Sequence, residues 1–142
     1  MASFIKFTIY NLHGLNQGIS MLFDLCGSMN VIAVQEHWLL ESETDRISDF
    51  HKDFIGIASF AMKHRSEAGL LVGRPHGGLG ILVRISLNVR MQVLAVQEDC
   101  RCLAESLRFP SNYTVLIFVT YFPCFVAGPE CQISFLKCLG FM

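Results

Sequence analysis

A strand–helix–strand pattern near the start of the chain constrains the fold more than any other feature. Residues 4–11 are rich in Phe, Ile and Tyr and predict a β-strand, and residues 31–36 predict a second one. Between them, apolar residues recur at helical spacing over residues 15–26, and Gly27 offers a place for the helix to stop. Two strands joined by a helix through short connections form a βαβ unit, in which the strands are parallel.

Each of these two strands ends in a side chain that carries a hard oxygen atom. Asn11 closes the first strand, and Glu36 follows the apolar run 31–34. Because the carboxyl ends of parallel strands meet at one edge of a sheet, we expect Asn11 and Glu36 to lie close together as ligands of a divalent metal such as Mg²⁺. Each also has an ordinary interpretation: Glu36 as a solvated strand end, and Asn11 as a residue that turns the backbone.

Tyr121, Arg74 and His76 are candidates for contacts with a phosphate group. Tyr121 ends an apolar run, and its hydroxyl can hydrogen-bond a phosphoryl oxygen. Arg74 and His76 belong to a glycine-rich stretch, 73–80, that lacks the Lys-Ser/Thr of a P-loop and precedes a strand. A surface loop is the alternative interpretation for this stretch. His37 is disfavoured as a catalytic base because neighbouring residues of a strand point to opposite faces.

From residue 76 onward the chain predicts short strands in an antiparallel meander, after one earlier strand candidate at 54–62. Strands are expected over 54–62, 81–83, 89–96, 103–109 and 113–121, polar loops over 37–53 (with one helical turn) and 63–75, a turn at Leu87-Asn88, and a helix over 126–139.

One of these strands is irregular, because Glu105 shares a face with Leu103 and Leu107. A carboxylate buried on that face without a partner is costly. Either the strand lies at the edge of its sheet, or the core tolerates an unfavourable residue.

The length of 142 residues limits the chain to one domain, 1–142, since domains commonly run to about 100–200 residues. The 52% of hydrophobic residues suffices for a core. With Lys+Arg 11 against Asp+Glu 12, binding of nucleic acid by overall charge is disfavoured, so any handling of phosphate must rest on a local site. The six cysteines form no Cys-x-x-Cys pair and indicate buried thiols in a reducing compartment.

The sequence indicates no signal peptide and no membrane segment. The most apolar stretch, 115–127, is interrupted by Pro123 and is shorter than the roughly 20 residues of a membrane-spanning helix. We therefore expect an intracellular protein, nuclear or cytoplasmic, with no membrane partner.

The motifs taken together resemble the endonuclease/exonuclease/phosphatase superfamily, and most closely the endonuclease domain of non-LTR (LINE-type) retrotransposons. The stretches that carry the resemblance occur in the family's order and span nearly the whole chain: 10–15 (YNLHGL), 31–39 (VIAVQEHWL), 77–84 (GGLGILVR) and 121–123 (YFP). The resemblance implies an α/β fold, a partial two-sheet α/β sandwich of the DNase I-like type.

The resemblance also implies functional roles. Glu36 and Asn11 would hold Mg²⁺ or Mn²⁺, Tyr121 would contact the phosphate as part of the catalytic centre, and DNA would be the substrate. A reverse transcriptase domain would be a partner in the parent element.

Two departures from the family pattern lead us to expect little or no nuclease activity from this chain. Relatives usually carry Asn where Val119 stands. The family's Gly-Asp-x-Asn strand and its Ser-Asp-His motif, which supply the general base and acid, do not occur in the 142 residues. We expect the C-terminal strands of the sandwich to be missing and an apolar sheet face to be exposed, in line with a mean hydropathy of +0.45. The alternatives are a catalytically dead binding module of this fold and a phosphatase that acts on small phosphorylated molecules.

Overall fold

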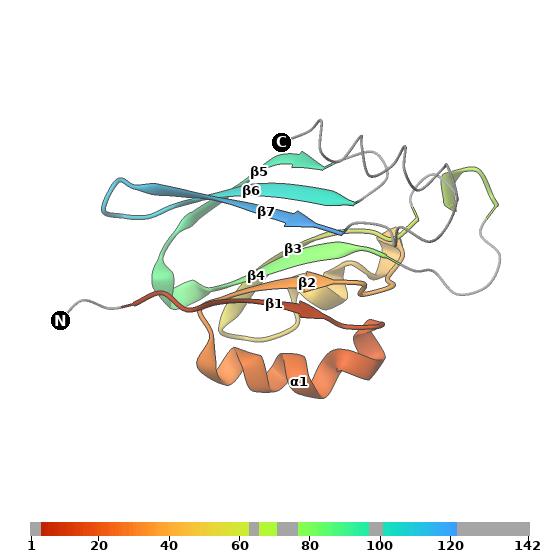
Figure 1. Cartoon of the computed structure of the whole chain (residues 1–142), viewed down its shortest axis with the longest axis horizontal. Helices are drawn as coiled ribbons and strands as arrows, with labels where there is room; N and C mark the ends of the chain where they lie inside the picture. The colour runs from red at the N-terminus through yellow and green to blue at the C-terminus, as the bar shows by residue number, and fades with distance from the viewer. Residues whose placement is uncertain (1–3, 63–65, 71–76, 97–100, 122–142) are drawn as a thin grey trace.

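A computed structural model describes residues 4–62, 66–70, 77–96 and 101–121 of the chain. Two β-sheets lie one above the other, and α1 lies under the first of them (Figure 1). The elements in chain order are β1 Phe7–Asn11, α1 Leu15–Ser28, β2 Val31–Gln35, η1 Glu41–Glu43, α2 Asp45–Ser48, β3 Phe54–Ser59, β4 Leu79–Arg84, η2 Ile85–Leu87, β5 Arg90–Val96, β6 Cys102–Arg108 and β7 Thr114–Thr120. The helix expected over 126–139 lies outside the described residues.

The βαβ unit expected at the start of the chain is confirmed. β1 and β2 pair in parallel, with Asn11 opposite Gln35 at their carboxyl ends. α1 buries one apolar stripe, formed by Leu15, Leu22 and Cys26, against the first sheet. Because β1 and β2 are parallel, the residues that follow them lie at the same edge of the sheet.

The end of α1 differs from the expectation. Gly27 lies inside the helix and does not stop it, because it does not adopt the positive φ with which a glycine terminates a helix. The helix ends at Ser28, where Met29 becomes extended and its N–H donates to the Leu25 carbonyl at 2.8 Å.

The first sheet is mixed, with strand order β1-β2-β4-β3, because β4 runs antiparallel to both β2 and β3. The strand expected over 81–83 therefore belongs to the sheet of the βαβ unit. Residues 31–34 of β2 are all buried since both faces of the sheet are covered. Ile32 and Val34 pack on the α1 side, and Val31 and Ala33 pack on the side of the second sheet.

The second sheet is the antiparallel meander β5-β6-β7, as expected. Its inner face packs on the first sheet in one hydrophobic cluster, whose buried members are Val31, Ala33, Leu79, Ile81, Val83, Leu103, Leu107, Phe109 and Val119. The molecule is thus an α/β sandwich of two sheets with helical elements on the far face of the first, which confirms the expected fold class.

Glu105 lies on β6, the central strand of the meander, so the interpretation of β6 as an edge strand is wrong. Its side chain is 0% exposed, and within the described part of the chain neither carboxylate oxygen has a hydrogen-bond partner. Its cross-strand neighbours are Val93 and Ile117. Burial raises the pKa of Glu105 to about 7. The core therefore tolerates an unfavourable residue.

The polar segment 37–53 holds two short helical pieces, η1 and α2, where one turn was expected. The buried Ile47 anchors α2 on the first sheet. The polar residues around it in the sequence did not predict this burial. Two strands are shorter than expected. β1 begins at Phe7 instead of residue 4, and β3 ends at Ser59 instead of residue 62.

Two of the cysteines, Cys26 and Cys102, are buried free thiols, as expected, and the other four lie outside the described residues. Among the residues that the structure describes, no helix has the length and apolar character needed to cross a lipid bilayer.

Candidate functional site

The candidate metal ligands lie at the carboxyl ends of adjacent parallel strands: Asn11 is the last residue of β1, and Glu36 follows β2. The Leu12 N–H donates to the Gln35 carbonyl at 2.8 Å, so the β-ladder continues one residue beyond β1. The Gly14 N–H donates to the Glu36 carbonyl at 2.7 Å. These two bonds hold the turn after β1 against the turn after β2.

Glu36 has a backbone conformation that side-chain-bearing residues rarely adopt. Its φ is 54°, in the left-handed region, and the same holds for His13 at 48° and Trp38 at 60°. Three such residues in two facing turns are the kind of local strain that is found at functional sites. The turn directs the Glu36 carboxylate toward the loop after β1.

His13 is the residue that meets Glu36 there, and sequence reasoning assigned it no role. Its Nδ1 lies 3.5 Å from Oε2 of Glu36, and the two side chains are 72% and 15% exposed respectively. The available signal was its position two residues after Asn11, in the turn that joins β1 to α1.

Asn11 uses its side chain to shape that turn. Its Oδ1 accepts a hydrogen bond from the His13 N–H at 3.0 Å. Asn11 therefore turns the backbone after β1, which is the structural role considered for it from the sequence. An amide oxygen has two lone pairs, so this bond leaves one for a second contact. The two roles weighed for Asn11 are therefore compatible.

His37, directly after Glu36, has a structural role. Its Nε2 is 2.8 Å from the Ser59 carbonyl, and its Nδ1 accepts from the Leu39 N–H at 3.0 Å. An Nδ1 that accepts carries no proton, and burial lowers the pKa of His37, so the ring is neutral. The ring also packs on Gly78, where an added Cβ would lie 2.3 Å from Cε1.

This neutral, enclosed imidazole agrees with the expectation that His37 is not a base. It instead fastens the turn of Glu36 to β3 and to the glycines before β4. Gly77 and Gly78 both have positive φ, as expected for glycines that turn the backbone there.

Tyr121 is brought to this end of the sandwich by a bond between the two sheets. Nε2 of Gln35, at the end of β2, donates to the Thr120 carbonyl at 2.7 Å. The Tyr121 N–H donates to the Arg101 carbonyl at 2.8 Å, and its partly buried side chain packs against the cluster between the sheets. Gln35 is thus a second residue whose part in the site was not deduced from the sequence.

Two of the predicted site residues cannot be placed, because Arg74 and His76 lie outside the described residues. In the ranges that are described, no group of three or more His, Cys, Asp and Glu side chains could hold a metal ion. The oxygens of Glu36 and Asn11 nevertheless suit Mg²⁺, which is commonly held by one or two carboxylates and keeps several waters.

Comparison with known proteins supports the fold. No protein-family model and no curated protein matches the sequence. Among solved structures, the chain is similar to a 3′ phosphatase, NExo, from Neisseria bound to a product DNA hairpin (14% identity, 95% of this chain and 49% of that chain, TM-score 0.61). It is also similar to an AP endonuclease from Archaeoglobus fulgidus (14% identity, 96% and 49%, TM-score 0.62).

A third similar structure is a 3′-5′ exonuclease, NExo, from Neisseria meningitidis (13% identity, 94% and 48%, TM-score 0.59). At these identities the likeness establishes the fold, which is the DNase I-like α/β sandwich. The chain spans about half the length of each of these solved chains.

Proposed function

We propose that this chain forms the metal-binding side of a divalent-metal-dependent phosphodiesterase centre that acts on DNA. One observation carries the proposal: the ends of β1, β2 and β7 converge, joined by the bond from Gln35 to the Thr120 carbonyl. The convergence gathers Asn11, at the end of β1, and Glu36 and Tyr121, which follow β2 and β7, at one end of the sandwich. The likeness to nucleases and a DNA 3′ phosphatase of the same fold supports this chemistry.

Each residue has a distinct part in this centre. The Glu36 carboxylate and the Asn11 amide oxygen hold Mg²⁺ or Mn²⁺. An ion held by these two residues would supply positive charge to stabilise the charge that develops on the scissile phosphate. Tyr121 donates its hydroxyl to a phosphate oxygen, and Arg74 and His76 contribute further contacts to the substrate.

The 142-residue polypeptide by itself cleaves DNA poorly under this proposal. Its sequence contains neither the Gly-Asp-x-Asn nor the Ser-Asp-His motif that the resemblance associates with proton transfer. Without a base to activate water, a centre that orients phosphate is expected to lose about 10²–10⁴-fold in rate. We further propose that residues 1–142 belong to the endonuclease domain of a LINE-type element, acting in the nucleus or cytoplasm beside a reverse transcriptase.

Metal binding is the direct test. Mn²⁺ binding to the purified polypeptide is measured by electron paramagnetic resonance for wild type, Glu36→Ala and Glu41→Ala, where Glu41 is an exposed carboxylate of η1. We expect Glu36→Ala to weaken binding more than about tenfold, since it removes the only carboxylate assigned to the ion. Glu41→Ala is expected to bind like wild type, and equal binding by all three proteins would reject the assignment.

Activity is tested separately with supercoiled plasmid, an oligonucleotide bearing a 3′-phosphate, and inositol polyphosphate, each with Mg²⁺. We expect little turnover of any of them. Robust plasmid nicking that is lost in Glu36→Ala contradicts the expected inactivity but supports the site. Phosphate release from inositol polyphosphate without nicking favours the small-molecule phosphatase. The reading frame downstream of codon 142 tests the LINE-type assignment, which predicts the two motifs and then a reverse transcriptase.

A further inference from the structure

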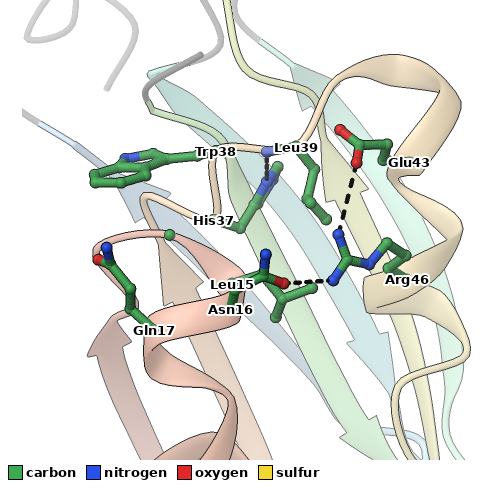
Figure 2. A pocket seen from close by; sticks show the side chains of 9 residues that line it. Leu15, Asn16, Gln17, His37, Trp38, Leu39, Glu43 and Arg46 are labelled. Carbon is green, nitrogen blue, oxygen red and sulfur yellow. Dashed lines mark hydrogen bonds and ion pairs between the residues drawn. The ribbon is translucent and has the colours of Figure 1, made fainter. Parts of the chain in front are cut away.

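A cavity of about 490 Å³ opens beside the candidate metal ligands. It lies between the first turn of α1, the segment 37–39 after β2, and the helical pieces η1 and α2 (Figure 2). Its volume falls within the roughly 300–1,000 Å³ typical of ligand pockets. Two of its lining residues adjoin the site: His37 follows Glu36 directly, and the N–H of Gly14 is bonded to the Glu36 carbonyl.

An aromatic wall forms one side of this pocket. The backbone of Trp38 has a φ of 60°, and its backbone N–H donates to the Gly77 carbonyl at 3.0 Å. Its ring packs so closely on Gly14 that an added Cβ there would lie 2.7 Å from Cε3. Gly14 therefore covers one face of the indole, and only the other face can take a stacked ring. Leu15 and Leu39, both buried, complete the apolar surface.

The opposite side carries planar polar groups in a fixed arrangement. Nη2 of Arg46 donates to Oδ1 of Asn16 at 2.7 Å, and Nη1 of Arg46 lies 3.6 Å from Oε1 of Glu43 (Figure 2). The bond to Arg46 sets the orientation of the Asn16 amide, so its nitrogen points away from the guanidinium. Gln17 adds a second amide at the same helix end.

The charges of this pocket disfavour a bare phosphate as its ligand. The Arg46 guanidinium is already paired with the Glu43 carboxylate, so the two charges cancel to first order. An anion would also meet the carboxylate itself. A planar, uncharged ring with donors and acceptors on its edge matches both the aromatic wall and the amides.

We propose that this pocket binds an unpaired nucleobase, stacked on Trp38 and hydrogen-bonded at its edge by Asn16 and Arg46. The inference rests on the proposed function, since a strand whose phosphate lies at Glu36 brings a neighbouring base to the pocket. It adds a base-binding subsite to a centre that otherwise contacts only phosphate. Because stacking accepts every base, the subsite senses single-stranded or distorted DNA more than sequence.

Trp38 is the only tryptophan of the chain, so its fluorescence reports on this pocket alone. A single-stranded 12-mer oligodeoxynucleotide, dAMP and inorganic phosphate are titrated in turn in EDTA, which removes any contribution from a metal. We expect saturable quenching by the 12-mer, weaker quenching by dAMP, and none by phosphate. Stronger binding of the 12-mer identifies a DNA strand, rather than a free nucleotide, as the source of the base.

Asn16→Ala and Arg46→Ala are the test variants, and Arg90→Ala on β5 is the matched control, because all three side chains are exposed. Each test variant is expected to weaken quenching by the 12-mer about tenfold, and the control not at all. Anisotropy of a fluorescein-labelled 12-mer provides a second measure of affinity. Equal affinities in all four proteins, or quenching by phosphate as strong as by dAMP, would overturn the proposal.

Glu36→Ala separates this proposal from the proposed function. Retained quenching in Glu36→Ala, together with lost Mn²⁺ binding, supports two independent sites. Unsaturable quenching by the 12-mer in a wild-type protein that binds Mn²⁺ through Glu36 overturns the nucleobase subsite and leaves the metal site standing.

Discussion

Replacing the buried Glu105 with leucine should stabilise the fold, and the gain should grow with pH. The pKa of Glu105 rises from an ordinary value of 4.5 to about 7 because burial disfavours the charged form. At 1.36 kcal/mol per pKa unit, the ionised carboxylate costs the folded state roughly 3 kcal/mol. Leucine suits a position flanked by Leu103 and Leu107 on the same face of β6.

The direction of the pH effect follows from proton binding. Between pH 4.5 and pH 7 the folded chain holds the Glu105 proton and the unfolded chain releases it, so rising pH lowers the free energy of unfolding. The loss is absent below this window and complete above it. From pH 5.5 to pH 8 wild type should lose about 2 kcal/mol relative to Glu105→Leu.

Urea denaturation followed by circular dichroism at pH 5.5 and pH 8 measures this difference. Glu41→Leu, at an exposed carboxylate, is the control and should show no comparable pH-dependent gain. The reasoning is refuted if the gain from Glu105→Leu is the same at both pH values, or if the substitution destabilises the chain at pH 8.

Two further substitutions test how the site is held together. Gly78→Ala should destabilise the fold by several kcal/mol more than Gly77→Ala. Both glycines have positive φ, but only at Gly78 would an added Cβ clash with the His37 ring. Thermal denaturation of the two variants measures the difference. Gln35→Leu removes the 2.7 Å bond to the Thr120 carbonyl and should cost roughly 1–3 kcal/mol in urea denaturation, whereas an unchanged midpoint would show that the bond does not hold the sheets together.

Regular hydrophobic spacing made the elements around the core predictable. The stripe of α1 and the apolar run of β2 identified the βαβ unit, and the spacing of β5, β6 and β7 identified the meander. The sheet to which β4 belongs could not be predicted in this way. Strand pairing depends on contacts between residues that are far apart in the sequence, and the local hydrophobic periodicity does not encode these contacts.

The site was predictable only where its residues follow strands. Asn11 and Glu36 were identified as candidates because topology sends the ends of parallel strands to one edge of the sheet. His13 and Gln35 were missed since their roles come from a left-handed turn and from a bond across the two sheets. Neither contact leaves a pattern in the local sequence.

The positive φ of Glu36 lowers the stability of the fold at a residue that is proposed to bind a metal ion. A side chain in this region costs about 1 kcal/mol relative to glycine, so a fold optimised only for stability would place glycine or asparagine there. Glu36→Gly should therefore yield a chain that is more resistant to unfolding and that, under the proposed role of Glu36, no longer holds a cation. Screens that reward thermal stability alone would select against the carboxylate, and they would remove the proposed metal ligand while improving the fold.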